Sequence, residues 1–449
     1  MSIKSTLPLA RQICSSPWTT IKVPRSELDL STTLKCGQSF RWQRRQSSPE
    51  SSPVWSCVLD QRLWYLQETL DGLQFKTYRT LPAAELDQIG SKGGNLVTKK
   101  SQDTPLDDAQ QDVDRDIAFL RDYFQLQVPL TELYEKWSQQ DRNFKTKAAN
   151  FPGVRILRQD PVENLFCFIC SSNNNISRIS QMVMNLCREY GTQISIPEES
   201  GNTSDEIYYG FPTVSALAQD GVEETLRRLG FGYRAKYISS SAKYIEAMEN
   251  GDEWLHGLRK LPYESAHEAL LALSGVGPKV ADCICLMSLD KSEAIPVDTH
   301  VWQIAIRDYK FRFEGKVPKT MSSGVYKAVS KHFVDLFGEY SGWAHSVLFA
   351  ADLRVIEGRT VPESSSTIVS VVKEENVELL VPIKSEDVNA DSGTKPAGRR
   401  SREQKRRPAN EKNLIKVQTG DPTPQGPIDT TEENGFRRSK RLRTKTEGV

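Results

Sequence analysis

The spacing of hydrophobic and polar residues changes twice along the chain. Between residues 17 and 89, short apolar runs rich in β-branched and aromatic side chains alternate with polar breaks, a pattern typical of strands. We expect strands at 54–59, 63–67 and 73–77. Residues 90–112 are polar and rich in Gly, Ser, Asp and Gln, which indicates a loop insertion.

From about Asp114 the apolar spacing becomes helical. Asp160 is the clearest N-cap, because Pro occupies the first turn after it and Glu the third position. The helix that follows, to about Ile169, is apolar nearly all round and is therefore expected to be buried. Another helix is expected at 176–190, where Gly191 ends it. Further helical patterns cover 214–229, 234–250, 265–273, 278–290, 299–308, 322–337 and 342–353.

These patterns predict an α+β fold, in which a small antiparallel β domain packs on a mostly α-helical domain. We expect a flexible N-terminus at 1–16, the β-rich domain at 17–150, the helical domain at 151–355 and a tail at 356–449. The tail is first acidic and then basic, with too few apolar residues for a core, so we expect it to be disordered. Its basic blocks favour nuclear import or attraction to DNA, and the alternative is a solubilising charged tail.

Composition excludes some classes of protein. The longest apolar runs fall short of the roughly 18 residues of a membrane span, and the N-terminus lacks the apolar core of a secretory signal. The first acidic residue is Glu27, and basic residues among Ser and Thr precede it. That leader is compatible with a mitochondrial transit segment, and an irregular tail before the first domain is the alternative. Without a secretory signal, we expect the eight cysteines to be reduced and mostly buried.

A glycine-rich turn between two expected helices carries the most specific signal. Gly275 and Gly277 permit unusual backbone shapes and leave their N–H groups uncovered, and Pro278 suits the first turn of the next helix. A turn that leads into a helix N-terminus binds anions, so this one is expected to bind a DNA phosphate. The alternative is a plain helix–helix turn.

Lys279 stands in the first turn of that helix, where the helix dipole disfavours a positive charge. Dipole and partial burial would keep part of the amine neutral, and a neutral amine can attack a sugar carbon and form an imine. Cys283 lies one helical turn further on the same face. A lysine that only contacts phosphate is the alternative.

Asp298 and His300 open the next expected helix. Asp298 either caps that helix or faces Lys279 across a cleft, where a carboxylate could stabilise positive charge on the sugar and assist proton transfers. His300 is either a phosphate contact or a plain surface histidine.

The run Gly275–Lys279 (GVGPK) and the later Pro296–Asp298 (PVD) together resemble the helix-hairpin-helix-Gly/Pro-Asp DNA glycosylases. Longer matches narrow the resemblance to the 8-oxoguanine DNA glycosylases, over about 17–354. They are residues 36–42 (CGQSFRW), 170–178 (CSSNNNISR), 232–235 (GYRA) and 342–344 (GWA).

The resemblance implies a TATA-binding-protein-like β domain on a helix-hairpin-helix domain, with the active site in a cleft. It implies that the damaged nucleotide is flipped out of the duplex, that Lys279 expels the base and that the imine can undergo β-elimination. Asp298 would be the acidic partner. No cofactor is implied for the chemistry, although the hairpin would hold a structural cation through the backbone carbonyls of Leu271, Leu273 and Val276.

The resemblance also assigns the base pocket and the DNA contacts. The Gly37 carbonyl would accept the N7 proton that distinguishes 8-oxoguanine from guanine. His345 stands where the family commonly has Gln, which leaves its contacts with the base open. The other pocket residues would be Cys283, Met287, Pro296 and Phe349. The residues on DNA would be Asn173, Arg178, Tyr233, Arg234, Gly275, Gly277, Val280 and His300.

We therefore expect a bifunctional glycosylase/lyase, monomeric and located in the nucleus, with mitochondrial delivery left open. Its partner would be double-stranded DNA that contains oxidised guanine, and no membrane. Two alternatives are a superfamily glycosylase for another lesion and a non-catalytic DNA-damage sensor, which would recognise the base without a covalent intermediate.

Overall fold

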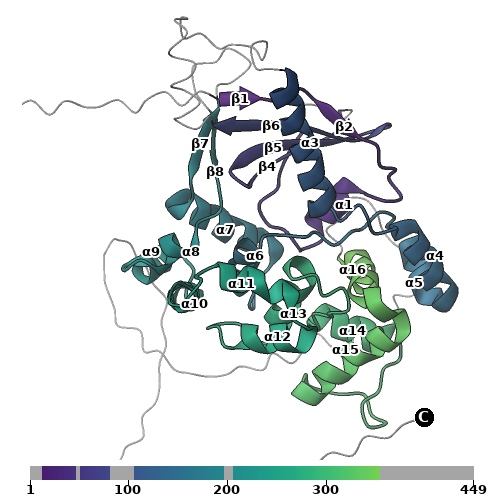
Figure 1. Cartoon of the computed structure of the whole chain (residues 1–449). Coiled ribbons are helices and arrows are strands. Elements are labelled where there is room, and N and C mark those ends of the chain that lie inside the picture. Colours follow the sequence, from purple (N-terminus) through teal and green to yellow (C-terminus); the bar gives the residue numbers. More distant parts are fainter. Residues whose placement is uncertain (1–12, 47–50, 81–105, 197–205, 354–449) are drawn as a thin grey trace, which may run out of the picture. The chain divides into compact units, whose positions relative to one another are not determined.

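The computed structural model describes residues 13–46, 51–80, 106–196 and 206–353. The N-terminal part of this range builds an antiparallel sheet in which β6, β5, β4 and β3 lie in that order, while β1 and β2 both pair with β6. Figure 1 shows this sheet above the helical part. The strands are β1 (Ile13–Ser15), β2 (Thr19–Ile21), β3 (Gln43–Arg45), β4 (Val54–Leu59), β5 (Arg62–Thr69) and β6 (Gly72–Thr80).

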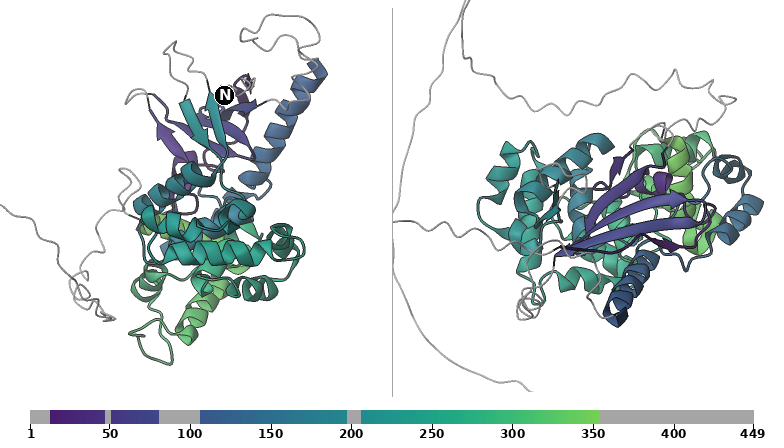
Figure 2. Two further views of the ribbon diagram at one scale, coloured as in Figure 1. Left: turned by 90° about the vertical axis from the view of Figure 1, so that its left-hand side faces the viewer. Right: turned by 90° about the horizontal axis from the view of Figure 1, so that it is seen from above.

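The sheet is covered on both faces. Helix α3 (Leu106–Tyr123) lies along one face (Figures 1 and 2), where Phe119 stacks on Trp64 with ring centroids 4.9 Å apart. A two-stranded hairpin, β7 (Gln193–Ile196) with β8 (Glu206–Tyr209), contributes to a separate apolar cluster with β4, β5 and β6. Because both faces are buried, β4 is apolar at almost every position rather than at alternate ones.

The helical part is organised around α6 (Pro161–Cys170), all of whose residues are buried. Asp160 caps α6 by accepting a hydrogen bond from Glu163 N at 2.9 Å, as the sequence predicts. Around it lie α7 (Ile176–Tyr190), α8 (Val214–Ala218), α9 (Val222–Arg228), α10 (Arg234–Glu246), α11 (Glu253–Gly257), η1 (Leu258–Lys260), α12 (Tyr263–Leu271), α13 (Pro278–Ser288), α14 (Thr299–Arg307), α15 (Ser323–Phe337), η2 (Gly338–Tyr340) and α16 (Ser341–Asp352).

A buried ion pair ties the two parts together. Arg41, in the segment between α1 (Leu30–Lys35) and β3, pairs with Glu163 on α6. The same guanidinium donates to the carbonyls of Val58 at 2.7 Å and Tyr209 at 3.1 Å. One side chain therefore joins the sheet, the β7–β8 hairpin and the central helix.

The structure corrects several expectations. The helix expected over 214–229 is two helices, because Gly221 adopts a left-handed φ of +80° between them. Residues 106–112 of the expected loop insertion belong to α3, while 81–105 lie outside the described residues. The short elements α1, β1–β3 and β7–β8 were not expected. The helices α4 (Leu130–Gln140) and α5 (Arg142–Ala148) lie where helical spacing was expected from about Asp114, although their bounds were not predicted.

The remaining predictions concern the cysteines, the membrane and the termini. The seven cysteines from Cys36 to Cys285 are free and buried, as expected, and burial raises the pKa of Cys36 to about 12. Among the described residues, no helix combines the length and apolar character that a membrane crossing requires. Of the N-terminal segment predicted at 1–16, residues 1–12 lie outside the described residues, as does the tail from 356, whereas residues 13–15 form β1.

Candidate active site

The glycine-rich turn joins α12 to α13, and its two glycines differ in what they require. Gly275 has φ +81°, and an added Cβ would lie 2.6 Å from the ring of Tyr237, so both backbone shape and space demand glycine. Gly277 is the N-cap of α13 with no side-chain cap, and an added Cβ would meet nothing within 4 Å. The N-terminus of α13 is therefore open, as an anion site must be.

Lys279 lies at this open end of α13. Its Nζ is 3.4 Å from Ser171 Oγ and 5.2 Å from the centroid of the Phe168 ring. Phe168 lies in the last turn of α6 and Ser171 is its C-cap, so the Lys279 amine contacts the C-terminal end of the buried central helix. The sequence did not single out these two residues, because a helix-end serine and a core aromatic carry no distinct signal.

Asp298 caps α14, since its Oδ1 accepts from His300 N at 2.9 Å and from Val301 N at 3.0 Å. It also lines the same groove as Lys279. The two interpretations considered for Asp298 are therefore compatible, because the residue caps α14 and also lines the groove. Two backbone donors fix the carboxylate, so its position is set before any ligand binds.

Cys283 and His345 each interact electrostatically with both Lys279 and Asp298. The thiol of Cys283 is within electrostatic range of both Lys279 and Asp298, and burial raises its pKa to about 11 while Lys279 opposes that rise. Burial likewise lowers the pKa of His345 to about 4, although Asp298 favours the charged ring. Neither ring nitrogen of His345 has a hydrogen-bond partner of good geometry, and an interaction with the Gly342 backbone opposes the lowering of the pKa together with Asp298.

The groove has a volume of about 2630 Å³ and brings many of the predicted residues together. The predicted residues that line it are Gly37, Asn173, Gly275, Gly277, Lys279, Val280, Asp298, His300 and Phe349. Val280 is only 4% exposed, so only its backbone amide can reach DNA. The predicted pocket residues Cys283, Met287, Pro296 and His345 are buried and do not line the groove.

Gly37 and Phe349 both line the groove and lie close to each other. Gly37 has φ +80°, and a Cβ there would make van der Waals contact with Phe349 Cε1 at 3.6 Å and with Ile176 Cδ1 at 3.4 Å. The Gly37 backbone itself is held by Gln38, whose side-chain amide donates to the carbonyls of Thr33 and Arg155 and accepts from Leu157 N.

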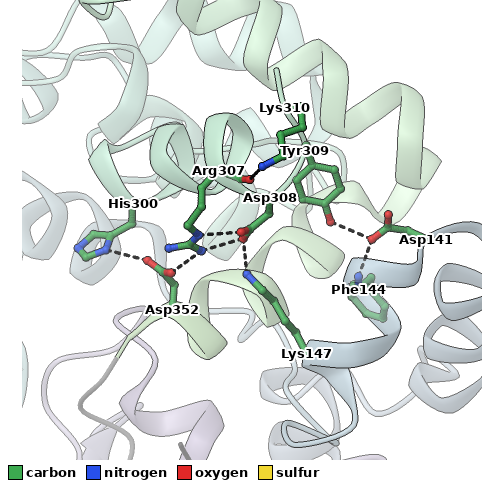
Figure 3. Close-up of polar contacts among 9 residues, drawn as sticks. All are labelled: Asp141, Phe144, Lys147, His300, Arg307, Asp308, Tyr309, Lys310 and Asp352. Carbon is green, nitrogen blue, oxygen red and sulfur yellow. Dashed lines mark hydrogen bonds and ion pairs between the residues drawn. The ribbon is translucent and has the colours of Figure 1, made fainter. Parts of the chain in front are cut away.

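His300, which lines the groove, belongs to a polar network that Figure 3 shows. Its Nδ1 lies 3.3 Å from Asp352 Oδ2, and Arg307 donates to Asp352 Oδ1 at 2.8 Å. Arg307 also pairs with Asp308, which Lys147 of α5 contacts at 2.5 Å. The sequence analysis missed Arg307, although it lies two helical turns after His300 on the same face.

The loop 171–175 gathers the residues predicted to contact the opposite strand. Asn173 is exposed with φ +46°, whereas Asn174 donates to Cys170 O at 3.0 Å and Asn175 caps α7. Of the three asparagine side chains, only that of Asn173 has no hydrogen bond in the described part of the chain. Its left-handed backbone, which asparagine tolerates, projects it from the loop.

Arg234 and Tyr233 support that loop. Arg234 is 4% exposed and donates to the carbonyls of Ser172 and Asn173, while Tyr233 Oη donates to Ser172 O at 3.1 Å. Arg234 therefore holds the loop through Nε and Nη2, and its contact with DNA stays a prediction. Arg178 is exposed in the first turn of α7.

The hairpin carbonyls predicted to hold a cation are those of Leu271, Leu273 and Val276. Leu273 O already accepts a hydrogen bond from Val276 N at 3.2 Å. The cation site stays a prediction.

Comparison with known proteins identifies the family. Residues 20–165 match the family "8-oxoguanine DNA glycosylase, N-terminal domain", and residues 166–322 match the "HhH-GPD superfamily base excision DNA repair protein". The chain is 34% identical over 345 residues to the N-glycosylase/DNA lyase OGG1 of Arabidopsis thaliana, covering 75% of this chain and 80% of the relative. It is 34% identical over 367 residues to the N-glycosylase/DNA lyase of Saccharomyces cerevisiae, covering 76% and 87%.

A solved structure agrees with these matches. The 8-oxoguanine glycosylase/lyase of Clostridium acetobutylicum, in complex with double-stranded DNA containing cytosine opposite 8-oxoG, aligns with TM-score 0.53 and 27% identity. The alignment covers 72% of this chain and 91% of that one. With both domains matched in order and Lys279 and Asp298 at one groove, the chain belongs to the 8-oxoguanine DNA glycosylase family of helix-hairpin-helix base-excision repair enzymes.

Proposed function

We propose that this protein excises 8-oxoguanine opposite cytosine from double-stranded DNA and can then nick the abasic site. The observation that carries the proposal is the placement of Lys279 at the open N-terminus of α13, in one groove with Asp298. The names of the relatives and of the structure aligned above support the same activity.

The chemistry begins with the neutral amine of Lys279. Its lone pair attacks C1′ of the flipped nucleotide, the glycosidic bond breaks, and the base departs with that electron pair and takes up a proton. The fixed carboxylate of Asp298 stabilises the positive charge that develops on the sugar. Loss of the amine proton and opening of the sugar ring give an imine. Removal of a C2′ proton then expels the 3′ phosphate and nicks the strand.

Selection of the base rests on Gly37. Its carbonyl would accept the N7 proton of 8-oxoguanine, whereas guanine presents an acceptor to that acceptor. An unpaired buried polar group costs about 1–3 kcal/mol, so one contact discriminates strongly. Gln38 keeps the carbonyl in place through its bonds to two other segments of backbone.

Borohydride trapping tests the proposal. Wild type incubated with a duplex containing 8-oxoguanine opposite cytosine should form a covalent adduct when borohydride reduces the imine. Lys279→Gln should form none. The matched control is Lys236→Gln, because Lys236 is also a lysine in the first turn of a helix, α10, and is exposed.

Each outcome separates the alternatives. Binding of the damaged duplex without an adduct would indicate a non-catalytic sensor. An adduct with another lesion but not with 8-oxoguanine would indicate a superfamily enzyme of different specificity. An undiminished adduct with Lys279→Gln would overturn the assigned nucleophile.

Three further points belong to the same proposal. The enzyme requires no cofactor for chemistry, acts as a monomer and works in the nucleus, with mitochondrial delivery left open. The proposed steps use only side chains of this chain, and the basic blocks after residue 394 support nuclear import.

A further inference from the structure

A buried carboxylate on α13 has partners that the chemistry above does not use. Asp282 is fully buried. Its Oδ1 accepts from Tyr263 Oη at 2.6 Å and lies 3.5 Å from His267 Nε2, while its Oδ2 accepts from Tyr326 Oη at 2.5 Å. A buried carboxylate is costly unless it is hydrogen-bonded, so these donors hold α13 firmly against α12 and α15.

One of these donors has a second bond. The hydroxyl of Tyr326, which donates to Asp282, also accepts from Val297 N at 3.2 Å. Asp282 lies three residues after Lys279, one turn along α13, and Val297 immediately precedes Asp298. A single phenol on α15 therefore bridges the two segments that carry the proposed nucleophile and its acidic partner.

The geometry makes this bridge directional. Lys279 and Asp298 come from different elements, so their separation depends on how α13 and the segment before α14 are held together. The Tyr326 hydroxyl donates its hydrogen bond to Asp282, so its oxygen lone pairs are available to accept from Val297 N–H. A misplacement of about 1 Å can cost on the order of 100-fold in rate, so a bond that fixes this separation bears on chemistry rather than on binding.

We propose that Tyr326 is a positioning residue, which through Asp282 and the Val297 amide sets the distance between the Lys279 amine and the Asp298 carboxylate. This inference rests on the proposed function. Tyr326 acts through the groups that it bridges and donates no proton to the substrate.

Tyr263 provides a matched control, because it donates to the same carboxylate but lies on α12 and makes no described bond to the Asp298 segment. We would compare Tyr326→Phe with Tyr263→Phe in the full chain. The measurements are single-turnover excision of 8-oxoguanine opposite cytosine, affinity for a duplex with an uncleavable tetrahydrofuran abasic analogue, and melting temperature.

Tyr326→Phe should lower the excision rate by about tenfold or more, with affinity for the analogue within about threefold of wild type. Tyr263→Phe should keep the rate within about threefold, because the bridge survives. Equal losses in the two variants, a wild-type rate in Tyr326→Phe, or a loss confined to affinity would each overturn the positioning role.

A second variant keeps the test decisive if Tyr326→Phe melts far below wild type. Asp282→Asn keeps the shape of the side chain but replaces one accepting oxygen by an NH2 donor. The hydroxyls of Tyr263 and Tyr326 can then no longer both donate to separate oxygens of this side chain. Its rate should also fall by about tenfold, and a wild-type rate would overturn the proposal. Absence of excision in wild type would instead reject the proposed function itself.

Discussion

His345 lies deeper in the helical part than a residue that reads a base edge was expected to lie. It is 5% exposed, and the Phe349 ring packs near it with centroids 6.1 Å apart. The pKa of His345 is lowered by burial from 6.5 to about 4, so the ring is neutral above pH 5. Protonation of His345 therefore takes place below the physiological pH range.

This shift has a consequence for stability. Because the folded state binds the His345 proton less tightly than the unfolded chain, stability falls as pH falls from 6.5 towards 4. His345→Gln removes this contribution, so the loss of unfolding free energy between pH 7 and pH 4.5 should shrink by up to about 3 kcal/mol. Urea unfolding of both proteins at the two pH values measures it, and an unchanged pH dependence would contradict the assignment.

Among the elements, the turn between α12 and α13 contains one glycine that the fold requires, Gly275, and one that DNA binding is expected to require, Gly277. In Gly275→Ala the added Cβ would lie 2.6 Å from the Tyr237 ring, and the residue would have to keep a left-handed φ. The substitution should therefore lower the free energy of unfolding by about 1–3 kcal/mol. Gly277→Ala meets open space, and should leave the melting temperature near wild type while its methyl group weakens DNA binding. Melting curves and duplex titrations would measure both, and equal melting temperatures for the two variants would contradict this division.

The sequence predicted the elements that its own residues define. The boundaries of α7 follow from its amphipathic pattern and Gly191, and the start of α6 follows from Asp160. The three-residue interval between α8 and α9 was missed, because helical spacing continues across Gly221 and hides its positive φ. The short strands β1 to β3 were missed since three residues carry too little pattern, and their pairing partners supply the rest.

At the scale of the whole molecule, Arg41 and Glu163 join the sheet to the central helix. Both side chains are almost fully buried, so Glu163→Gln would leave the Arg41 charge without its partner. We expect the free energy of unfolding to fall by about 3–5 kcal/mol. The exposed pair Lys331–Asp335 is the control, and Asp335→Asn should cost less than about 1 kcal/mol.

Urea unfolding of Glu163→Gln and Asp335→Asn would measure this difference. Equal values for the two variants would mean that the buried pair does not hold the two parts together. The contacts of Arg41 could not be predicted from the motif 36–42 alone, because Glu163 and Tyr209 are more than 100 residues away in sequence. The proposed catalytic pair, Lys279 and Asp298, could be predicted from the sequence because each residue lies at a recognisable helix start.

The matches with the two family domains end at residue 322, and the described residues end at 353. Deletion of 356–449 should therefore leave single-turnover excision within about twofold of the full chain when enzyme is saturating. It should lower affinity for DNA at low salt, because the deleted basic blocks attract phosphate. If the deletion abolished turnover in low salt, the tail would be part of the enzyme, and the domain boundary predicted at 355/356 would be wrong.

Lys279 is proposed to form the covalent bond to the sugar. Peptide mapping by mass spectrometry of the borohydride-reduced adduct formed with an 8-oxoguanine:cytosine duplex would locate that bond. We expect the modification on Lys279, in the peptide that begins α13. Modification of another lysine or of the N-terminal amine, or excision without any adduct, would contradict it.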